Sequence, residues 1–175
     1  FIIKVGNIYY YYCLYNGVLQ EEFPYRTKIF IASSILGPWT YASNFQPVGT
    51  IGAEDAAAHY ASSVVFDSGT YHVFSGVMDG VGYANITRDT APAPTGPWTS
   101  QGLVLSDLIR GLPENPKVWW DSILNRWCML TNQINIPAGT FTDKNRIFMS
   151  TSLTDWSAAT YKDIQFALLY GAQAN

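Results

Sequence analysis

Two short stretches of this sequence place ionisable side chains just ahead of an apolar run. Asp55 and His59 precede the run that starts at Val64, and Glu114 precedes the run that starts at Val118. Carboxyl and imidazole groups in such positions can give or take a proton in general acid–base catalysis. Composition alone favours a simpler interpretation, in which Glu114 lies in an exposed, proline-flanked loop and Asp55 and His59 are surface residues.

Other kinds of chemistry find little support in the residue types. The two histidines, His59 and His72, and the two cysteines, Cys13 and Cys128, show no metal-ligand spacing. The sequence contains no phosphate-binding loop, dinucleotide fingerprint or nucleophile elbow. We therefore expect no metal site and no cofactor. The cysteines are most simply interpreted as buried thiols, with a disulfide as the alternative in an oxidising compartment.

The composition narrows the range of partners. The chain has 175 residues, of which 48% are hydrophobic, 15% aromatic and only 13% charged, and its formal net charge is −3. This balance excludes the basic surface that nucleic-acid binding requires, and no apolar run approaches the roughly 20 residues of a membrane-spanning helix. The length predicts one domain. Many aromatic and few charged residues suit an extracellular or cell-surface protein, which is the location we expect.

The elements that position the candidate residues recur along the chain. Gly37-Pro38-Trp39-Thr40 returns as Gly96-Pro97-Trp98-Thr99, and a weaker third copy is Thr154-Asp155-Trp156-Ser157. The three tryptophans are spaced by 59 and 58 residues. A fixed period of this kind indicates one repeated supersecondary unit. We expect the proline to fix a corner and the tryptophan to pack between neighbouring units.

Each unit has the local pattern of four β-strands. An apolar run, a turn with glycine and an aromatic strand come first, a third strand follows, and the tryptophan corner leads to an outer strand. The sequence therefore predicts an all-β fold of β-propeller blades, at approximately 1–50, 60–106 and 114–160. Because propellers close with about four to eight blades, we expect 1–175 to be a single propeller domain or a fragment of one, with the rest of the propeller outside this chain.

The stretches IASSILGPWT, SSVVFDSGTYHVFSG and ENPKVWWDSILNRWCML resemble the blades of five-bladed β-propeller glycoside hydrolases. The pattern is most similar to glycoside hydrolase family forty-three, with its invertase-like and arabinanase-like relatives. The resemblance implies a parent of five blades and three carboxylates around a central tunnel, each at the entry to an inner strand of a different blade. One would activate water, one would protonate the leaving group and one would tune the acid. A calcium ion in the tunnel also fits the resemblance, although no residue pattern here indicates it.

The resemblance transfers to individual positions only in part. Glu114-Asn115-Pro116 matches the E-x-P stretch before the inner strand of the third blade, which makes Glu114 the candidate general acid. The second blade has Ala61-Ser62 where the family has Asp-Pro. Asp55 is then the candidate carboxylate for tuning the acid, and His59 is a candidate for tuning it or for binding a sugar hydroxyl. The catalytic base would precede Phe1, outside the given chain.

Aromatic side chains provide candidate sugar contacts, because the apolar face of a pyranose packs on rigid Trp and Tyr rings. Trp119 and Trp120 follow Glu114 by 5 and 6 positions on the predicted inner strand, where alternation places one on each face of the sheet. Tyr60 occupies the position of Glu114 in the repeat and is expected to face the tunnel. For at least one of the two tryptophans, core packing between blades is the favoured alternative.

These observations leave two functions open. The first is a glycoside hydrolase that acts on the glycosidic bonds of oligo- or polysaccharides, with Glu114 as the acid. The second is a non-catalytic propeller that binds carbohydrate or builds an extracellular assembly. The intact E-x-P stretch favours the first function, and Ala61-Ser62 favours the second. In both, the expected partner is carbohydrate, with no nucleic acid and no membrane span.

Overall fold

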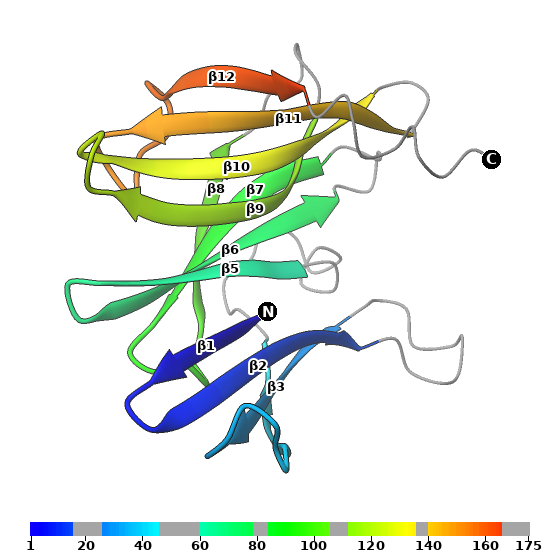
Figure 1. The fold of residues 1–175 in the computed structure, drawn as a ribbon, viewed down its shortest axis with the longest axis vertical. Coiled ribbons are helices and arrows are strands. Elements are labelled where there is room, and N and C mark those ends of the chain that lie inside the picture. Colours follow the sequence, from blue (N-terminus) through cyan, green and yellow to red (C-terminus); the bar gives the residue numbers. More distant parts are fainter. Residues whose placement is uncertain (16–25, 46–59, 79–83, 106–111, 136–139, 166–175) are drawn as a thin grey trace.

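The computed structural model describes residues 1–15, 26–45, 60–78, 84–105, 112–135 and 140–165 (Figure 1). Within these ranges the chain forms strands joined by turns and bends, and the strands make three four-stranded antiparallel sheets. The predicted all-β fold is therefore confirmed. In the described part of the chain, no helix has the length and hydrophobicity needed to cross a bilayer.

Each sheet follows the chain order, so that every strand pairs with the next one along the sequence. Blade 1 consists of β1 (Ile2–Val5), β2 (Ile8–Tyr15), β3 (Arg26–Ala32) and β4 (Thr40–Asn44). Blade 2 consists of β5 (Tyr60–Asp67), β6 (Thr70–Met78), β7 (Ala84–Ala91) and β8 (Thr99–Leu105). Blade 3 consists of β9 (Leu112–Asp121), β10 (Arg126–Asn135), β11 (Thr140–Ser150) and β12 (Thr160–Gln165).

Local sequence explains how the first hairpin of each blade closes. The β1–β2 turn places Gly6 at φ 57°, and the β5–β6 turn places Ser68 at φ 48° and Gly69 at φ 83°. A positive φ at the first central residue, as in the β1–β2 turn, or at both, as in the β5–β6 turn, is the turn geometry that matches the twist of the flanking strands. The β9–β10 turn is longer and uses Asn125 at φ 51°. The glycine-containing turns expected from the repeat therefore set the register of the first hairpins in blades 1 and 2, and a longer turn without glycine closes that of blade 3.

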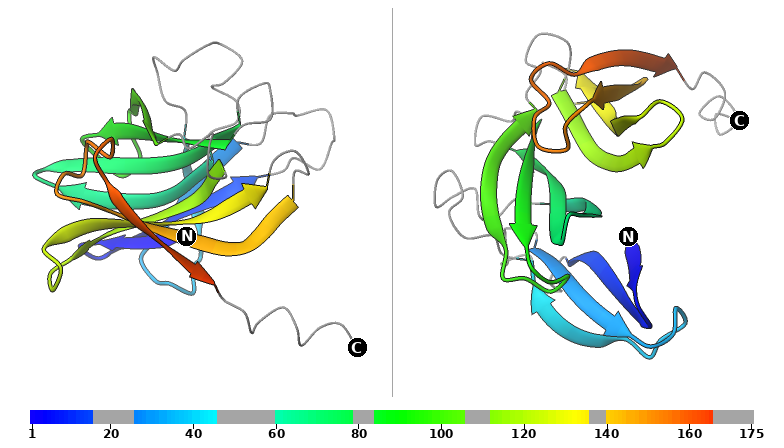
Figure 2. Two further views of the ribbon diagram at one scale, coloured as in Figure 1. Left: turned by 90° about the horizontal axis from the view of Figure 1, so that it is seen from above. Right: turned by 90° about the vertical axis from the view of Figure 1, so that its left-hand side faces the viewer.

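The three blades stand side by side around a common axis, with β1, β5 and β9 on the inside (Figure 2). Two hydrophobic cores fill the seams between them. The first core joins blades 1 and 2 and includes Tyr12 and Val73, and the second joins blades 2 and 3 and includes Phe74 and Met129. Val73 and Phe74 are neighbours on β6 and are both fully buried, on opposite faces of the sheet. Blade 2 is therefore covered on both faces.

The tryptophan corner fastens each blade to the one before it. Trp98, at the corner of blade 2, is 2% exposed and packs edge-to-face on Phe45, which follows β4, with 5.3 Å between ring centroids. Trp156 of blade 3 packs in the same way on Phe74 of blade 2, at 6.4 Å. The expected packing between neighbouring units is confirmed for both residues. Trp39, at the same position in blade 1, is only half-buried.

Two hydrogen bonds and one glycine hold the corner of blade 2. The Tyr12 hydroxyl of β2 donates to the carbonyl oxygen of Pro94 at 2.5 Å, and the Ser43 hydroxyl of β4 donates to that of Thr95 at 3.1 Å. Gly96 has a φ of 96°, and a Cβ there would lie 2.9 Å from Cδ1 of the corner tryptophan. Glycine is needed at this position because it adopts such a φ without strain and leaves room for the indole.

The two cysteines lie in different blades. Cys13 on β2 is half-buried, Cys128 on β10 is buried, and both are free thiols. Burial raises the pKa of both thiols, and the nearby charge of Asp121 raises that of Cys128 further. The structure therefore agrees with the buried-thiol interpretation and not with a disulfide between them.

The corner tryptophan offers a test of the seam. Trp98→Ala is expected to lower the free energy of unfolding by about 3–5 kcal/mol, because it removes a fully buried indole and leaves a cavity. Ile123→Ala, at a turn where the side chain is 93% exposed, should change it by less than about 0.5 kcal/mol. Urea unfolding followed by circular dichroism measures both. Equal losses in the two variants would contradict the role of the corner.

His72 is a buried titratable group in the second seam. It lies on β6, is 7% exposed, and pairs with Val65, which packs on the second core. Its Nδ1 is 3.1 Å from Nη1 of Arg88. Because a guanidinium only donates, Nδ1 accepts this bond and the ring is neutral. Burial, followed by the charge of Arg88, lowers the pKa of His72, while the charge of Asp67 opposes the shift.

The lowered pKa of His72 predicts that stability depends on pH. The unfolded chain protonates this residue below about pH 6.5, and the folded chain does so only at a lower pH. The contribution of His72 to the free energy of unfolding should therefore be fully present above about pH 6.5 and be lost as the pH drops through the pKa of the folded state. His72→Gln removes this contribution. Urea unfolding from about pH 5 to about pH 7.5 compares the two proteins, and identical pH profiles would refute the assignment.

Candidate functional site

The inner strands β1, β5 and β9 begin at the same end of the molecule, which we call the entry end (Figure 1). Lys117 of β9 reaches the other two strands there. Its Nζ donates to the carbonyl oxygen of Ser62 on β5 at 2.6 Å and lies 5.1 Å from the ring centroid of Phe1, the residue before β1. One side chain thus joins residues from all three blades at the axis.

Buried polar contacts fix the beginnings of the inner strands across the seams. The Ser63 hydroxyl of β5 accepts a hydrogen bond from the backbone N–H of Val118 on β9 at 2.9 Å, and it donates to the carbonyl oxygen of Val118 at 3.5 Å. Across the first seam, the backbone N–H of Ala61 donates to the Thr27 hydroxyl of β3 at 3.3 Å. A buried polar group that loses its partner costs about 1–3 kcal/mol, so these contacts resist any slip of β5 or β9.

Both β5 and β9 carry a β-bulge just inside the entry end. The β5–β6 register shifts between Ala61 and Ser63, and the β10–β9 register shifts between Leu130 and Asn132. A bulge bends its strand and re-aims the adjacent residues, and bulges are frequent next to active sites. Sequence reasoning missed both of them. The one hint in the sequence was an asparagine, Asn115, next to Pro116, because asparagine tolerates a positive φ better than most residues. In the structure its φ is 51°.

The structure places two predicted residues at matching positions in their blades. Tyr60 pairs with Gly76, and Glu114 pairs with Asn132, so that each lies at the entry side of its bulge. The strand pairing therefore agrees with the sequence repeat, which aligned Tyr60 with Glu114. For both residues the structure describes the backbone, and their side chains lie outside the description.

Two other predicted residues, Asp55 and His59, lie outside the described residues, and their roles stay predictions. Among the residues that are described, no three His, Cys, Asp or Glu side chains come together closely enough to hold a metal ion. Lys117 is a polar residue of the entry end that sequence reasoning did not select. In the repeat, Lys117 aligns with Ser63, the residue at the start of the inner strand of blade 2, and this alignment could have indicated that Lys117 lies at the entry end. Burial lowers the pKa of Lys117.

Trp119 and Trp120 lie towards the other end of β9, beside the turn to β10. Trp119 is 38% exposed and pairs with Cys128, and Trp120 is 43% exposed and pairs with Trp127. Five and six residues of extended strand separate them from Glu114, which corresponds to about 17–20 Å. The structure therefore does not bring the two tryptophans next to Glu114.

Several solved structures of glycoside hydrolases have a similar fold. An exo-β-1,3-galactanase from Phanerochaete chrysosporium, solved with β-1,3-galactotriose, is 13% identical at a TM-score of 0.57, over 91% of this chain and 48% of its own. A family 117 glycoside hydrolase from Zobellia galactanivorans is 12% identical at a TM-score of 0.62, over 95% and 54%. A family 43 β-xylosidase/α-arabinofuranosidase from a compost metagenome, solved with xylotriose, is 16% identical at a TM-score of 0.61, over 93% and 57%.

The chain spans about half the length of these three structures. No protein-family model matches the sequence, and no curated protein does either. Identities of 12–16% support a shared architecture and leave activity open. The resemblance seen in the sequence is thus confirmed at the level of the fold: the described residues form three blades with the architecture found in β-propeller glycoside hydrolases.

Proposed function

We propose that this chain is part of a propeller glycoside hydrolase that cleaves glycosidic bonds of oligo- or polysaccharides, with Glu114 as the general acid. The observation that carries the proposal is the position of Glu114 on β9. It lies on the entry side of a bulge, at the end where Lys117, Ser62 and Phe1 join the three inner strands. A residue at this position can meet groups from other blades that are distant in the sequence.

The chemistry needs two groups with opposite tasks. The acid donates a proton to the glycosidic oxygen as the bond to the anomeric carbon breaks, while a base takes a proton from the attacking water in the inverting case. The pKa of the acid must lie near the working pH. In our proposal the base comes from outside residues 1–175, Asp55 tunes Glu114, and His59 and Tyr60 contact the sugar.

The structural neighbours support a carbohydrate substrate. The galactanase was solved with β-1,3-galactotriose and the xylosidase with xylotriose. Each structure holds a neutral trisaccharide, and these two trisaccharides are therefore suitable first substrates for this protein. An extracellular or cell-surface location, where such polymers occur, remains part of the proposal.

Further blades would complete the propeller. Trp98 and Trp156 are both 2% exposed because each packs on the preceding blade, whereas Trp39 has no blade before it in this chain and is half-buried. We propose that blades of the same protein outside residues 1–175 cover the face that carries Trp39. They would also supply the remaining groups of the site.

The acid assignment predicts the outcome of one conservative exchange. Glu114→Gln keeps the size of the side chain and removes its proton, so kcat on xylotriose or β-1,3-galactotriose should fall by about 10²–10⁴-fold. Binding of the trisaccharide, measured by calorimetry, should persist. Asp155→Asn, at the exposed corner of blade 3, is the matched control and should keep full activity. Undiminished turnover by Glu114→Gln would remove this residue from the mechanism.

A second candidate function is carbohydrate binding without catalysis. Ala61 and Ser62 occupy the place of the Asp-Pro pair in the resembling family, and the Ser62 carbonyl is engaged by Lys117. Blade 2 thus offers a structural contact where a carboxylate would be needed for catalysis. Binding of the trisaccharides by the full-length protein with no product formed would favour this function over the first.

A further inference from the structure

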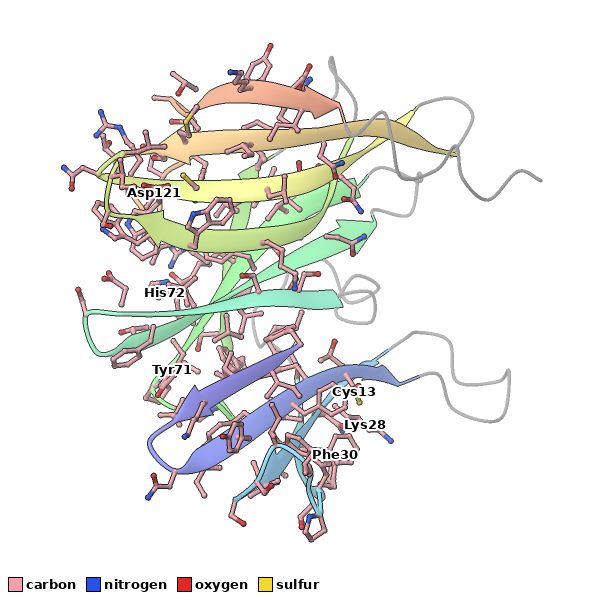
Figure 3. All side chains as sticks on the ribbon, in the orientation of Figure 1. Cys13, Lys28, Phe30, Tyr71, His72 and Asp121 are labelled. Atoms are coloured by element: carbon pink, nitrogen blue, oxygen red, sulfur yellow. The ribbon has the colours of Figure 1, made fainter. Side chains whose placement is uncertain are left out.

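The end of the molecule opposite the entry, which we call the hairpin end, repeats one feature in all three blades. There, each inner strand turns back into the second strand of its blade, and Figure 3 shows Tyr71, His72 and Asp121 at this end. In each hairpin, the second pair of residues from the turn lies at the same position. Three cross-strand pairs occupy matching positions and each contains an aromatic ring: Lys4 with Tyr9, Phe66 with Tyr71, and Trp120 with Trp127.

In blades 2 and 3, one ring of the pair is packed and the other lies in solvent. Tyr71 is 7% exposed while Phe66 is 60% exposed, with 4.7 Å between their centroids. Trp127 packs against the second core while Trp120 is 43% exposed, with 5.3 Å between centroids and 67° between planes. Each inner ring thus supports an outer ring whose surface is open.

Further blades cannot cover these outer rings. Phe66 is two residues from Val64, and side chains two apart on a strand share a face. Val64 packs on the first core, so Phe66 faces the seam between blades 1 and 2. By the same reasoning Trp120 shares the face of Val118 and borders the seam between blades 2 and 3. Both seams are already filled by the packed side chains of the three blades, so a blade added beside blade 1 or blade 3 would not enter them.

The surroundings of the rings are rigid and close to neutral. Asp121 accepts hydrogen bonds from the backbone N–H groups of Ile123 and Leu124, both at 2.9 Å, which fixes the turn beside Trp120. The charged side chains at the three turns are of both signs: Lys4, Asp67, Asp121 and Arg126. Open aromatic rings on a rigid, charge-balanced surface suit a neutral ligand that has apolar C–H faces and hydroxyl groups.

We propose that the hairpin end is a second carbohydrate-binding surface, on which Phe66 and Trp120 stack against sugar rings of a neutral polysaccharide, remote from the entry end. The class of ligand rests on the proposed function. The two rings belong to neighbouring blades, so one polysaccharide chain can contact both. The other sugar units of that chain can then reach the entry end or extend into solvent. The surface thus holds the polymer close to the protein, and it does not take part in bond cleavage.

The test compares binding of a polymer with cleavage of a trisaccharide. The double variant Phe66→Ala/Trp120→Ala is prepared in the full-length protein, and its affinity for insoluble xylan and β-1,3-galactan is measured by depletion isotherms. We expect at least about fivefold weaker binding of the polymer, since each ring loses a stacking partner. Leu103→Ala, at a 49% exposed site on the outer strand of blade 2, is the matched control and should bind like the wild type.

A second variant separates ring stacking from folding. Phe66→Tyr/Trp120→Tyr keeps both rings and should bind the polymer within about twofold of the wild type, and thermal melts verify that each variant is folded. Unchanged polymer binding by the double alanine variant would overturn the proposal. So would a parallel loss of trisaccharide cleavage, or failure of the wild type to bind either polymer. Hydrolysis by the Glu114→Gln variant is measured in a separate assay. The result for the proposed hydrolase function is therefore independent of the result for polymer binding at the hairpin end.

Discussion

A four-stranded antiparallel sheet in this protein has two apolar faces, and neither can remain in water. The stacking of the blades follows from this constraint. Val73 and Phe74, adjacent on β6, are both fully buried because one points into each seam. Burying a large apolar side chain stabilises the fold by about 1.5–3 kcal/mol, and both faces of the middle blade contribute. The blades must therefore stack, and stacking around an axis brings their first strands together.

The seams are specific as well as apolar. Tyr12 and Ser43 bind carbonyl groups of the next corner, and Ser63 holds both backbone groups of Val118. Hydrophobic contact alone would allow neighbouring sheets to slide, whereas buried hydrogen bonds are satisfied in one register only. The result is that the beginnings of β5 and β9 are fixed relative to each other. A site assembled from different blades depends on that precision.

The inner strands have two ends with different properties. At the entry end, bulges interrupt the ladders, and Lys117 links β9 to Ser62 and Phe1. At the hairpin end, the strand pairing is regular, and a cross-strand pair near each turn contains an aromatic ring. The entry end suits side chains that must be oriented precisely towards a reacting bond. The hairpin end suits stacking of a ligand on exposed aromatic rings.

The sequence by itself determined the strands, the repeat and the corner, because these depend on local chemistry. Period-two apolar patterning and turn residues such as Gly6 and Gly69 are readable within a few residues, and the recurring tryptophan shows where each unit ends. Only the tertiary structure decided which side chains meet. The contact of Lys117 with Ser62 and Phe1 joins separate blades, the bulges arise from strand pairing, and Trp120 lies far from Glu114 because a strand is extended. Periodicity along one chain cannot show these relations, since they are set by how the sheets stack and twist around the axis.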